Sequence, residues 1–297
     1  MKSVVDFAID TFFRVLVWAA LKLDYEKRLK VFGSVFRAVI GPLSGYTRRA
    51  EANLQLVFPD MPQEQVRETA RSVTANFGKN LIENYSKDDI VQRLPTAEIG
   101  GAGLEHLHAA IAQGKPVLLL SGHIGNYEVI RLILYNMGHQ SAGLYRPASI
   151  ARFNQHYVKT LSYLSGPVFP QTRRGILSFV RHLKGGGVAA MLFDVRDKNY
   201  DTIAFLGQPA HTSTFPAEIA IKTGAVIIPC FAHRCEDGVT HAVCFEEPIA
   251  HSTPKEMMTE ASDRLGAHIV RFPDQWLWVH NRWALRRDLI KDTGHDT

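Results

Sequence analysis

The chain has 297 residues, of which 46% are hydrophobic and 21% charged, so it can bury an ordinary core and is not a disordered chain. The formal net charge of +5 favours an anionic partner, such as a membrane surface, a phosphorylated lipid, an acidic carrier protein or nucleic acid. Because the sequence has no zinc-finger spacing, aromatic RNA-binding motif or long Lys/Arg tract, we expect no nucleic-acid partner.

Residues 4–23 form an apolar run about long enough to span a bilayer, but Asp6, Asp10 and Arg14 interrupt it. No small-residue cleavage site follows, so the run is not a signal peptide. We expect an interfacial or membrane-inserted helix, and the alternative is an ordinary helix packed on the domain. The lipid would receive Phe12, Phe13, Leu16 and Trp18, and anionic headgroups would attract Lys22, Lys27, Arg28 and Lys30.

The rest of residues 1–95 has few strand signals and reads as helical, with breaks at Gly41-Pro42 and at Phe58–Pro62. A helix over 63–87 carries apolar residues at helical spacing. We therefore expect a helical N-terminal region over 1–95, with the membrane-associated helix at its start.

From about residue 100, strands alternate with helices. The pattern predicts strands at 117–120, 141–145, 188–193 and 225–232, with 240–245 returning antiparallel to the last. Helices are predicted at 104–113, 127–136, 176–183, 216–223 and 254–270. This alternation predicts an α/β domain over 96–297, with a mixed, mostly parallel central sheet flanked by helices, in which function gathers at the carboxyl ends of the strands.

The segment after the first buried strand combines a histidine, two glycines and a glutamate. His123 lies in a turn that Gly122 and Gly125 permit, Asn126 suits a helix N-cap, and Glu128 follows in the first helical turn. On one straight helix, His123 and Glu128 would lie about 140° apart, so they meet only if the histidine is on the loop. Such a pair can act as a general base on an alcohol that attacks an ester or thioester. The alternative is a structural His–Glu contact.

Several ordered blocks of the chain carry recognisable motifs: residues 121–128, Arg48-Arg49, Asn53-Leu54, Phe58-Pro59, 145–147, Arg174-Gly175, 205–207 and 273–283. Together these blocks resemble the lipid A biosynthesis acyltransferases, the lauroyl and myristoyl transferases of Gram-negative bacteria, within the glycerolipid acyltransferase superfamily. The resemblance implies transfer of a fatty acyl chain from an acyl carrier protein thioester, or a coenzyme A thioester, to a hydroxyl of a lipid A precursor. It also implies a catalytic pair of His123 and Glu128, with no metal or other cofactor.

Four further residues complete the predicted substrate-binding set. Arg174, which matches the family's Arg block, is the preferred phosphate anchor, and Arg146 is the second. Asn126 would help hold substrate, and Asp194, at the end of the strand 188–193, would support the site by hydrogen bonding. The alternatives are solvated or ion-paired arginines and a loop-capping aspartate.

Two other functions remain open in the sequence. The acceptor could be a lysophospholipid, an aminolipid or a glycosylated phosphatidylinositol, or the chain could be a non-catalytic lipid-binding protein. We expect the protein at the cytoplasmic face of the inner membrane, peripheral or N-terminally anchored.

Three tryptophans, Trp276, Trp278 and Trp283, lie close together near the C-terminus. For these residues, packing in the protein core is favoured over a belt at the membrane interface.

Overall fold

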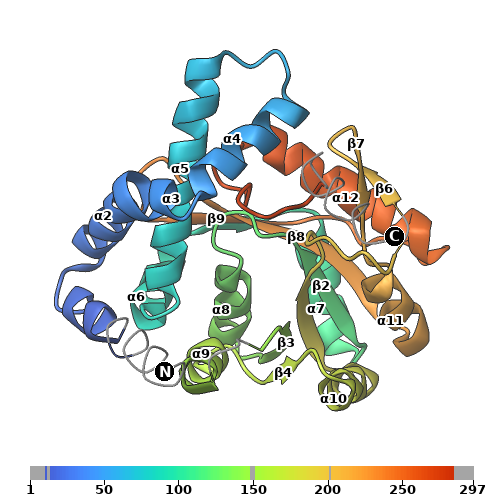
Figure 1. The fold of residues 1–297 in the computed structure, drawn as a ribbon. Coiled ribbons are helices and arrows are strands. Elements are labelled where there is room, and N and C mark those ends of the chain that lie inside the picture. Colours follow the sequence, from blue (N-terminus) through green and yellow to red (C-terminus); the bar gives the residue numbers. More distant parts are fainter. Residues whose placement is uncertain (1–10, 12–13, 148–150, 201, 284–297) are drawn as a thin grey trace.

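The computed structural model describes residues 11, 14–147, 151–200 and 202–283, and its centre is a seven-stranded sheet (Figure 1). The strand order is β1-β9-β8-β2-β5-β3-β4. Neighbouring strands run parallel except β8 and β9, which are antiparallel, as predicted for that hairpin. The strands are β1 (Glu98–Gly100), β2 (Val117–Ser121), β3 (Ser141–Tyr145), β4 (Val168–Pro170), β5 (Val188–Leu192), β8 (Val226–Arg234) and β9 (His241–Phe245).

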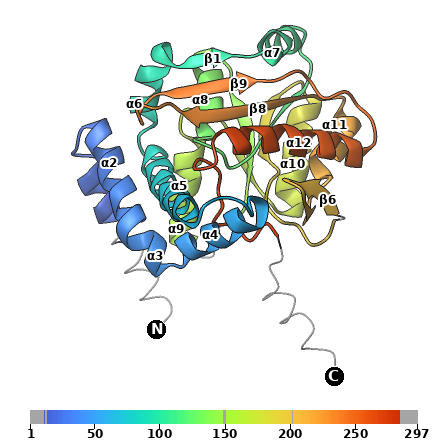
Figure 2. The same ribbon diagram turned by 90° about the horizontal axis from the view of Figure 1, so that it is seen from above.

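Helices cover both faces of the sheet (Figures 1 and 2). These helices are α7 (Gly103–Ala112), α8 (Glu128–Asn136), α9 (Ala151–Ser162), α10 (Arg173–Lys184), α11 (Phe215–Thr223) and α12 (Pro254–Arg271). Alternate side chains of β2 enter two separate cores: Leu118 and Leu120 pack in the core that includes α10–α12, and Val117 and Leu119 in the core that includes α7 and α8. The predicted mixed, mostly parallel α/β sheet is therefore confirmed. A separate hairpin is formed by β6 (Thr202–Phe205) and β7 (Gln208–His211).

The N-terminal part is helical, as predicted. Its elements are α2 (Tyr25–Val35), the π-helical η1 (Phe36–Ile40), α3 (Gly41–Leu43), α4 (Tyr46–Val57), α5 (Gln63–Glu83), α6 (Lys87–Arg93) and the 3₁₀ turn η2 (Leu94–Thr96). The predicted break at Phe58–Pro62 is confirmed. The predicted break at Gly41-Pro42 is wrong, because the chain stays helical to Leu43. The helix is widened there by η1, in which the Gly41 N–H donates to the Phe36 carbonyl.

Of the predicted membrane helix 4–23, residues 4–10, 12 and 13 lie outside those described. Residues 14–20, which are described, are helical. None of the described helices has both the length and the unbroken apolar run that crossing a bilayer requires.

Candidate active site

The candidate site lies at the carboxyl edge of two neighbouring parallel strands. β2 and β5 pair in register, with Ser121 opposite Leu192, and the Phe193 N–H donates to the Ser121 carbonyl just past the strand ends. His123 follows β2 by two residues and Asp194 follows β5 by two. The pairing of the strands therefore brings the two side chains together at the edge where α/β proteins place their sites.

His123 and Asp194 form a hydrogen-bonded pair. The imidazole Nδ1 lies 2.8 Å from Asp194 Oδ1, and the backbone N–H of His123 donates to Oδ2 at 2.8 Å. The Asp194 side chain is 2% exposed and the His123 side chain 23%. Since a carboxylate accepts the Nδ1 proton, the lone pair of the imidazole is on Nε2, which has no partner among the described residues. The partly exposed Nε2 is thus available as a base.

The surroundings of Asp194 keep its carboxylate ionised. Burial alone would raise its pKa, but the charge interaction with His123, the two hydrogen bonds from His123 and a third from the Trp276 indole outweigh burial. Together they lower the pKa of Asp194 to about 2. At neutral pH this carboxylate fixes the tautomer of the imidazole and stabilises the imidazolium form.

Two glycines let the loop hold this geometry. Gly125 has a φ of +52°, and a Cβ there would lie 2.0 Å from the Ala232 carbonyl oxygen. A Cβ at Gly122 would lie 2.6 Å from a methyl carbon of Leu265 and 3.1 Å from Asp194 Oδ2. Gly125 is therefore required for its backbone conformation, whereas a side chain at position 122 would displace the Leu265 methyl groups and crowd the carboxylate.

Glu128, predicted as the partner of His123, lies elsewhere. Its carboxylate is buried, 3.1 Å from Lys87 Nζ and 3.4 Å from Arg131, and these two cations keep its pKa below the usual value although burial opposes them. Lys87 Nζ also donates to the carbonyls of Leu161 and Tyr163 and to Ser165. In the structure, the carboxylate on the imidazole is that of Asp194, and Glu128 pairs with Lys87 of α6 and Arg131 of α8.

Asn126, predicted to bind substrate, is used inside the protein. It is 2% exposed, its amide donates to Glu83, and its carbonyl oxygen accepts the Glu128 N–H. The N-cap residue of α8 is Tyr127, so Asn126 lies one position before the predicted cap, although its side chain binds the N–H of the first helical residue. Its side chain is therefore not placed to contact a substrate.

The two predicted arginines, Arg146 and Arg174, lie along the same edge of the sheet, together with Arg173, which was not predicted as a site residue. Arg146 follows β3, and Arg173 and Arg174 begin α10 just after β4, where the Gln171 N–H donates to the Tyr145 carbonyl at 2.8 Å. All three are exposed, and none forms an ion pair with the described residues. The strand order is β2-β5-β3-β4. Along the carboxyl edge of the sheet, His123 and Asp194 therefore come first, after β2 and β5, and the arginines follow, after β3 and β4.

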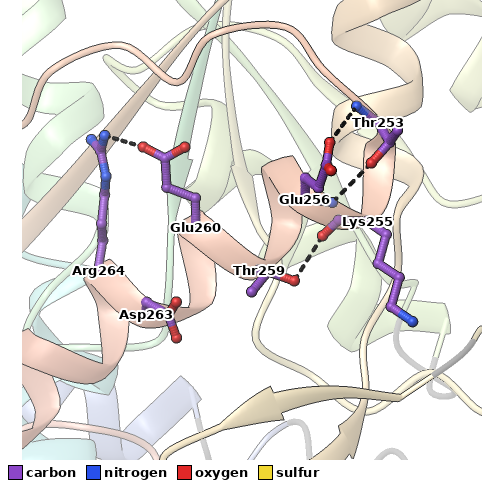
Figure 3. Close-up of a pocket in the computed structure, with 7 residues that line it drawn as sticks. All are labelled: Thr253, Lys255, Glu256, Thr259, Glu260, Asp263 and Arg264. Atoms are coloured by element: carbon purple, nitrogen blue, oxygen red, sulfur yellow. Dashed lines mark hydrogen bonds and ion pairs between the residues drawn. The ribbon is translucent and has the colours of Figure 1, made fainter.

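A surface hollow on α12 is distinct from this edge (Figure 3). Its polar side chains bond one another along a single helix: Thr253 and Glu256 form a capping box, and Glu260 pairs with Arg264. Neither His123 nor Asp194 lines it. These groups stabilise the helix, so we do not assign the hollow to the candidate site.

Sequence reasoning missed the roles of Lys87 and Trp276. Lys87 is a 1% exposed cation in a helix with no apolar signature, and nothing in its neighbours points to Glu128. The Trp276 indole, in the block 273–283, donates to Asp194 at 2.7 Å, but Asp194 lies outside the blocks, so the sequence held no signal for this bond. Asp194 itself was predicted to support the site, and the structure shows its contact.

Comparison with known proteins shows the family to which the chain belongs. The family model described as "Bacterial lipid A biosynthesis acyltransferase" matches residues 3–284, and the chain belongs to that family. It is 24% identical over 253 residues to a lipid A biosynthesis acyltransferase of Haemophilus influenzae, covering 81% of this chain and 76% of that protein. It is 21% identical over 284 residues to the lipid A biosynthesis lauroyltransferase of Escherichia coli, covering 91% and 90%. A phosphatidylinositol mannoside acyltransferase of Mycolicibacterium smegmatis is 22% identical over 252 residues, covering 81% and 80%. The protein is an acyl-transferring enzyme.

Proposed function

We propose that the protein is an O-acyltransferase that moves a fatty acyl chain from an acyl carrier protein thioester to a hydroxyl of a lipid A precursor. The observation that carries the proposal is the His123–Asp194 pair, with its free Nε2 at the carboxyl edge of the sheet, in a chain of this family. The lauroyltransferase from Escherichia coli, matched over 91% of this chain, supports the choice of acceptor.

The pair supplies general-base catalysis without an enzyme nucleophile. His123 Nε2 takes the proton of the acceptor hydroxyl as its oxygen attacks the thioester carbonyl. The tetrahedral intermediate collapses, the carbon–sulfur bond breaks, and the imidazolium returns the proton to the leaving thiolate. An ester and a free thiol result, and Asp194 stabilises the imidazolium between the two proton transfers.

Two backbone donors close to His123 are occupied. The N–H groups of Gly125 and Glu128 already bond the Gln275 carbonyl and the Asn126 side chain. These two groups are therefore not free to stabilise the charge that develops on the carbonyl oxygen. The exposed guanidinium groups of Arg146 and Arg174 lie on the same edge and suit the phosphates of the acceptor.

A second acceptor is supported by a specific finding. The mycobacterial phosphatidylinositol mannoside acyltransferase is about as similar to this chain, at 22% identity, as the lipid A enzymes are. A glycosylated phosphatidylinositol and a lipid A precursor share a sugar hydroxyl and a phosphate. The same base and the same arginines would serve either acceptor, so the choice rests on an assay.

A membrane surface is the proposed setting for the reaction. Large exposed hydrophobic side chains concentrate on the N-terminal helices (blue in Figures 1 and 2), where Trp18 is 63% exposed and Leu43 83%. Exposed Lys22 and Lys30 lie among them, whereas Arg28, predicted to face headgroups, is buried against Ser86 and Asp89. An apolar face with flanking cations fits an anionic lipid surface. The apolar residues are Val15, Leu16, Trp18, Leu21, Leu23, Val31, Val35, Val39, Ile40 and Leu43.

Flotation with vesicles that contain anionic lipid tests the membrane proposal. Leu43→Glu places a charge on this face and should reduce the bound fraction. Val270→Glu is the matched control, because Val270 is 58% exposed on α12, and it should bind as the unaltered protein does. Equal binding of both variants would sink the assignment of this face.

The acceptor is tested with purified protein and a radiolabelled acyl carrier protein thioester. We expect label in a lipid A precursor and not in a glycosylated phosphatidylinositol. Mass spectrometry of lipids from a strain that lacks the gene should show lipid A with one secondary acyl chain fewer. Unchanged lipid A in that strain contradicts the proposed acceptor.

A further inference from the structure

We propose that Trp276 is a positioning residue that holds the Asp194 carboxylate in the orientation the His123 imidazole needs. This inference rests on the proposed function for its kinetic consequence, but its structural part is measured separately. It goes beyond the predicted packing role of the tryptophans, because it concerns the indole N–H rather than the ring.

The two carboxylate oxygens of Asp194 accept hydrogen bonds from different donors. Oδ1 faces the imidazole Nδ1, while Oδ2 accepts the His123 backbone N–H and the Trp276 indole N–H at 2.7 Å. With two donors on Oδ2, rotation of the carboxylate would break both bonds. The indole therefore locks the side-chain torsion that directs Oδ1 at the histidine.

The main chain beside Trp276 is bound to the His123 loop. The Gly125 N–H donates to the Gln275 carbonyl at 2.9 Å, and the Leu277 N–H donates to the His123 carbonyl at 3.0 Å. These bonds form a short antiparallel bridge with Trp276 opposite Ile124. One segment thus fixes both the backbone that carries the histidine and the carboxylate that orients it.

That segment is itself anchored from distant parts of the chain. The Asn53 amide donates to the carbonyls of Trp278 and His280, at 2.7 and 3.0 Å. The Gln275 side chain accepts the Arg234 N–H and donates to its carbonyl. Trp276 is 1% exposed, with the Trp278 ring centroid 4.8 Å away. The indole is therefore rigidly placed before any substrate binds.

Trp276→Phe removes the indole N–H, and Trp283→Phe is the matched control. Trp283 is 3% exposed in the same aromatic cluster, 5.9 Å from the Trp276 ring, and its N–H has no partner among the described residues. Both substitutions remove similar apolar volume, but only the first removes a donor from Asp194. If Trp276→Phe does not fold, a benzothienylalanine at position 276 keeps the ring and replaces the N–H by sulfur.

Two readouts decide the inference. In steady-state acyl transfer, Trp276→Phe should lower kcat about ten- to hundredfold with little change in KM for the thioester, as loss of a hydrogen bond to a charged group predicts. In proton NMR of histidine-labelled protein, the Nδ1–H signal that His123→Ala removes should weaken or exchange faster in Trp276→Phe. Trp283→Phe should retain both the signal and a kcat within about threefold of the unaltered enzyme.

An unchanged Nδ1–H signal in Trp276→Phe, or a kcat no lower than that of Trp283→Phe, would overturn the inference. Complete absence of acyl transfer in the unaltered protein contradicts the proposed function instead. In that case the NMR comparison alone still decides whether Trp276 positions Asp194.

Discussion

The His123 imidazole is held by the carboxylate of Asp194, a residue 71 positions away in the sequence, at a distance of 2.8 Å. The glutamate five positions from His123 is instead bound to Lys87 and Arg131. We therefore expect separate functions for the two carboxylates: Asp194 should orient the base, and Glu128 should neutralise two buried cations. Variants at the two positions should differ accordingly.

Asp194→Asn should lower kcat at least about a hundredfold while the protein stays folded. Because two N–H donors face Oδ2, the amide oxygen of the asparagine takes that place and its NH₂ faces Nδ1. The imidazole proton then moves to Nε2, which no longer accepts a proton from the acceptor. Steady-state acyl transfer and circular dichroism measure the two properties. Asp197→Asn, the same change on the same loop, is the control, and equal rates in both variants would be inconsistent with the pair.

Glu128→Gln should act mainly on stability. It leaves Lys87 and Arg131 buried without a counter-charge, which costs about 3 kcal/mol of the free energy of unfolding. Urea denaturation measures this loss. Glu68→Gln is the control: it removes a carboxylate that is 56% exposed and paired with Arg37, and should cost well under about 1 kcal/mol. A Glu128→Gln protein that is fully stable but inactive would return Glu128 to the role predicted from the sequence.

Arg174→Ala should raise the KM for a phosphorylated acceptor about tenfold and change kcat little, because an exposed guanidinium at the site edge binds the phosphate before the chemical step. Acceptor titration at fixed thioester measures this. Arg181→Ala, at the other end of α10, changes the net charge equally and should leave KM unaltered. If both variants have the same KM, the effect of Arg174→Ala comes from the change in net charge and not from a contact with the phosphate.

The stability of the fold should decrease below neutral pH because of His233. Burial, with the nearby His268 and Arg271, lowers the pKa of His233 to about 3. In the unfolded chain this histidine has a pKa near 6.5. Between about pH 6.5 and pH 3 the unfolded state therefore binds a proton that the folded state does not, and this favours unfolding as the pH falls. This group then removes up to about 1.4 kcal/mol of unfolding free energy per pH unit. Urea denaturation between pH 7.5 and 4.5 should show a shallower dependence in His233→Gln, and identical slopes would exclude this origin.

Much of the fold was predictable because its signals are local. The strand at 141–145 was predicted with the bounds the structure gives, and β2 was evident from its continuous apolar run. The three-residue β1 and β4 are too short to show periodicity. The hairpin β6–β7 was missed although Leu206 and Gly207, both with positive φ, mark its turn. Helix α9 was also missed.

The candidate site was predictable only in part, because one of its contacts depends on strand order. Sequence spacing indicated Glu128, which lies five residues beyond His123 and on the helix that follows. The contact with Asp194 requires β2 and β5 to be neighbours in the sheet. No local sequence pattern predicts which strands are neighbours. His123 was identified correctly as lying on the loop, and Asp194 was placed at the end of its strand. What the sequence lacked was the pairing that joins the two ends.

The most direct test of the account is single-turnover acyl transfer by the purified protein from a radiolabelled acyl carrier protein thioester to a lipid A precursor. The unaltered protein should form the labelled ester without a labelled protein intermediate, and folded His123→Ala should be slower by at least about a thousandfold. Transfer by His123→Ala at a rate close to that of the unaltered protein would contradict the central claim that His123 is the base.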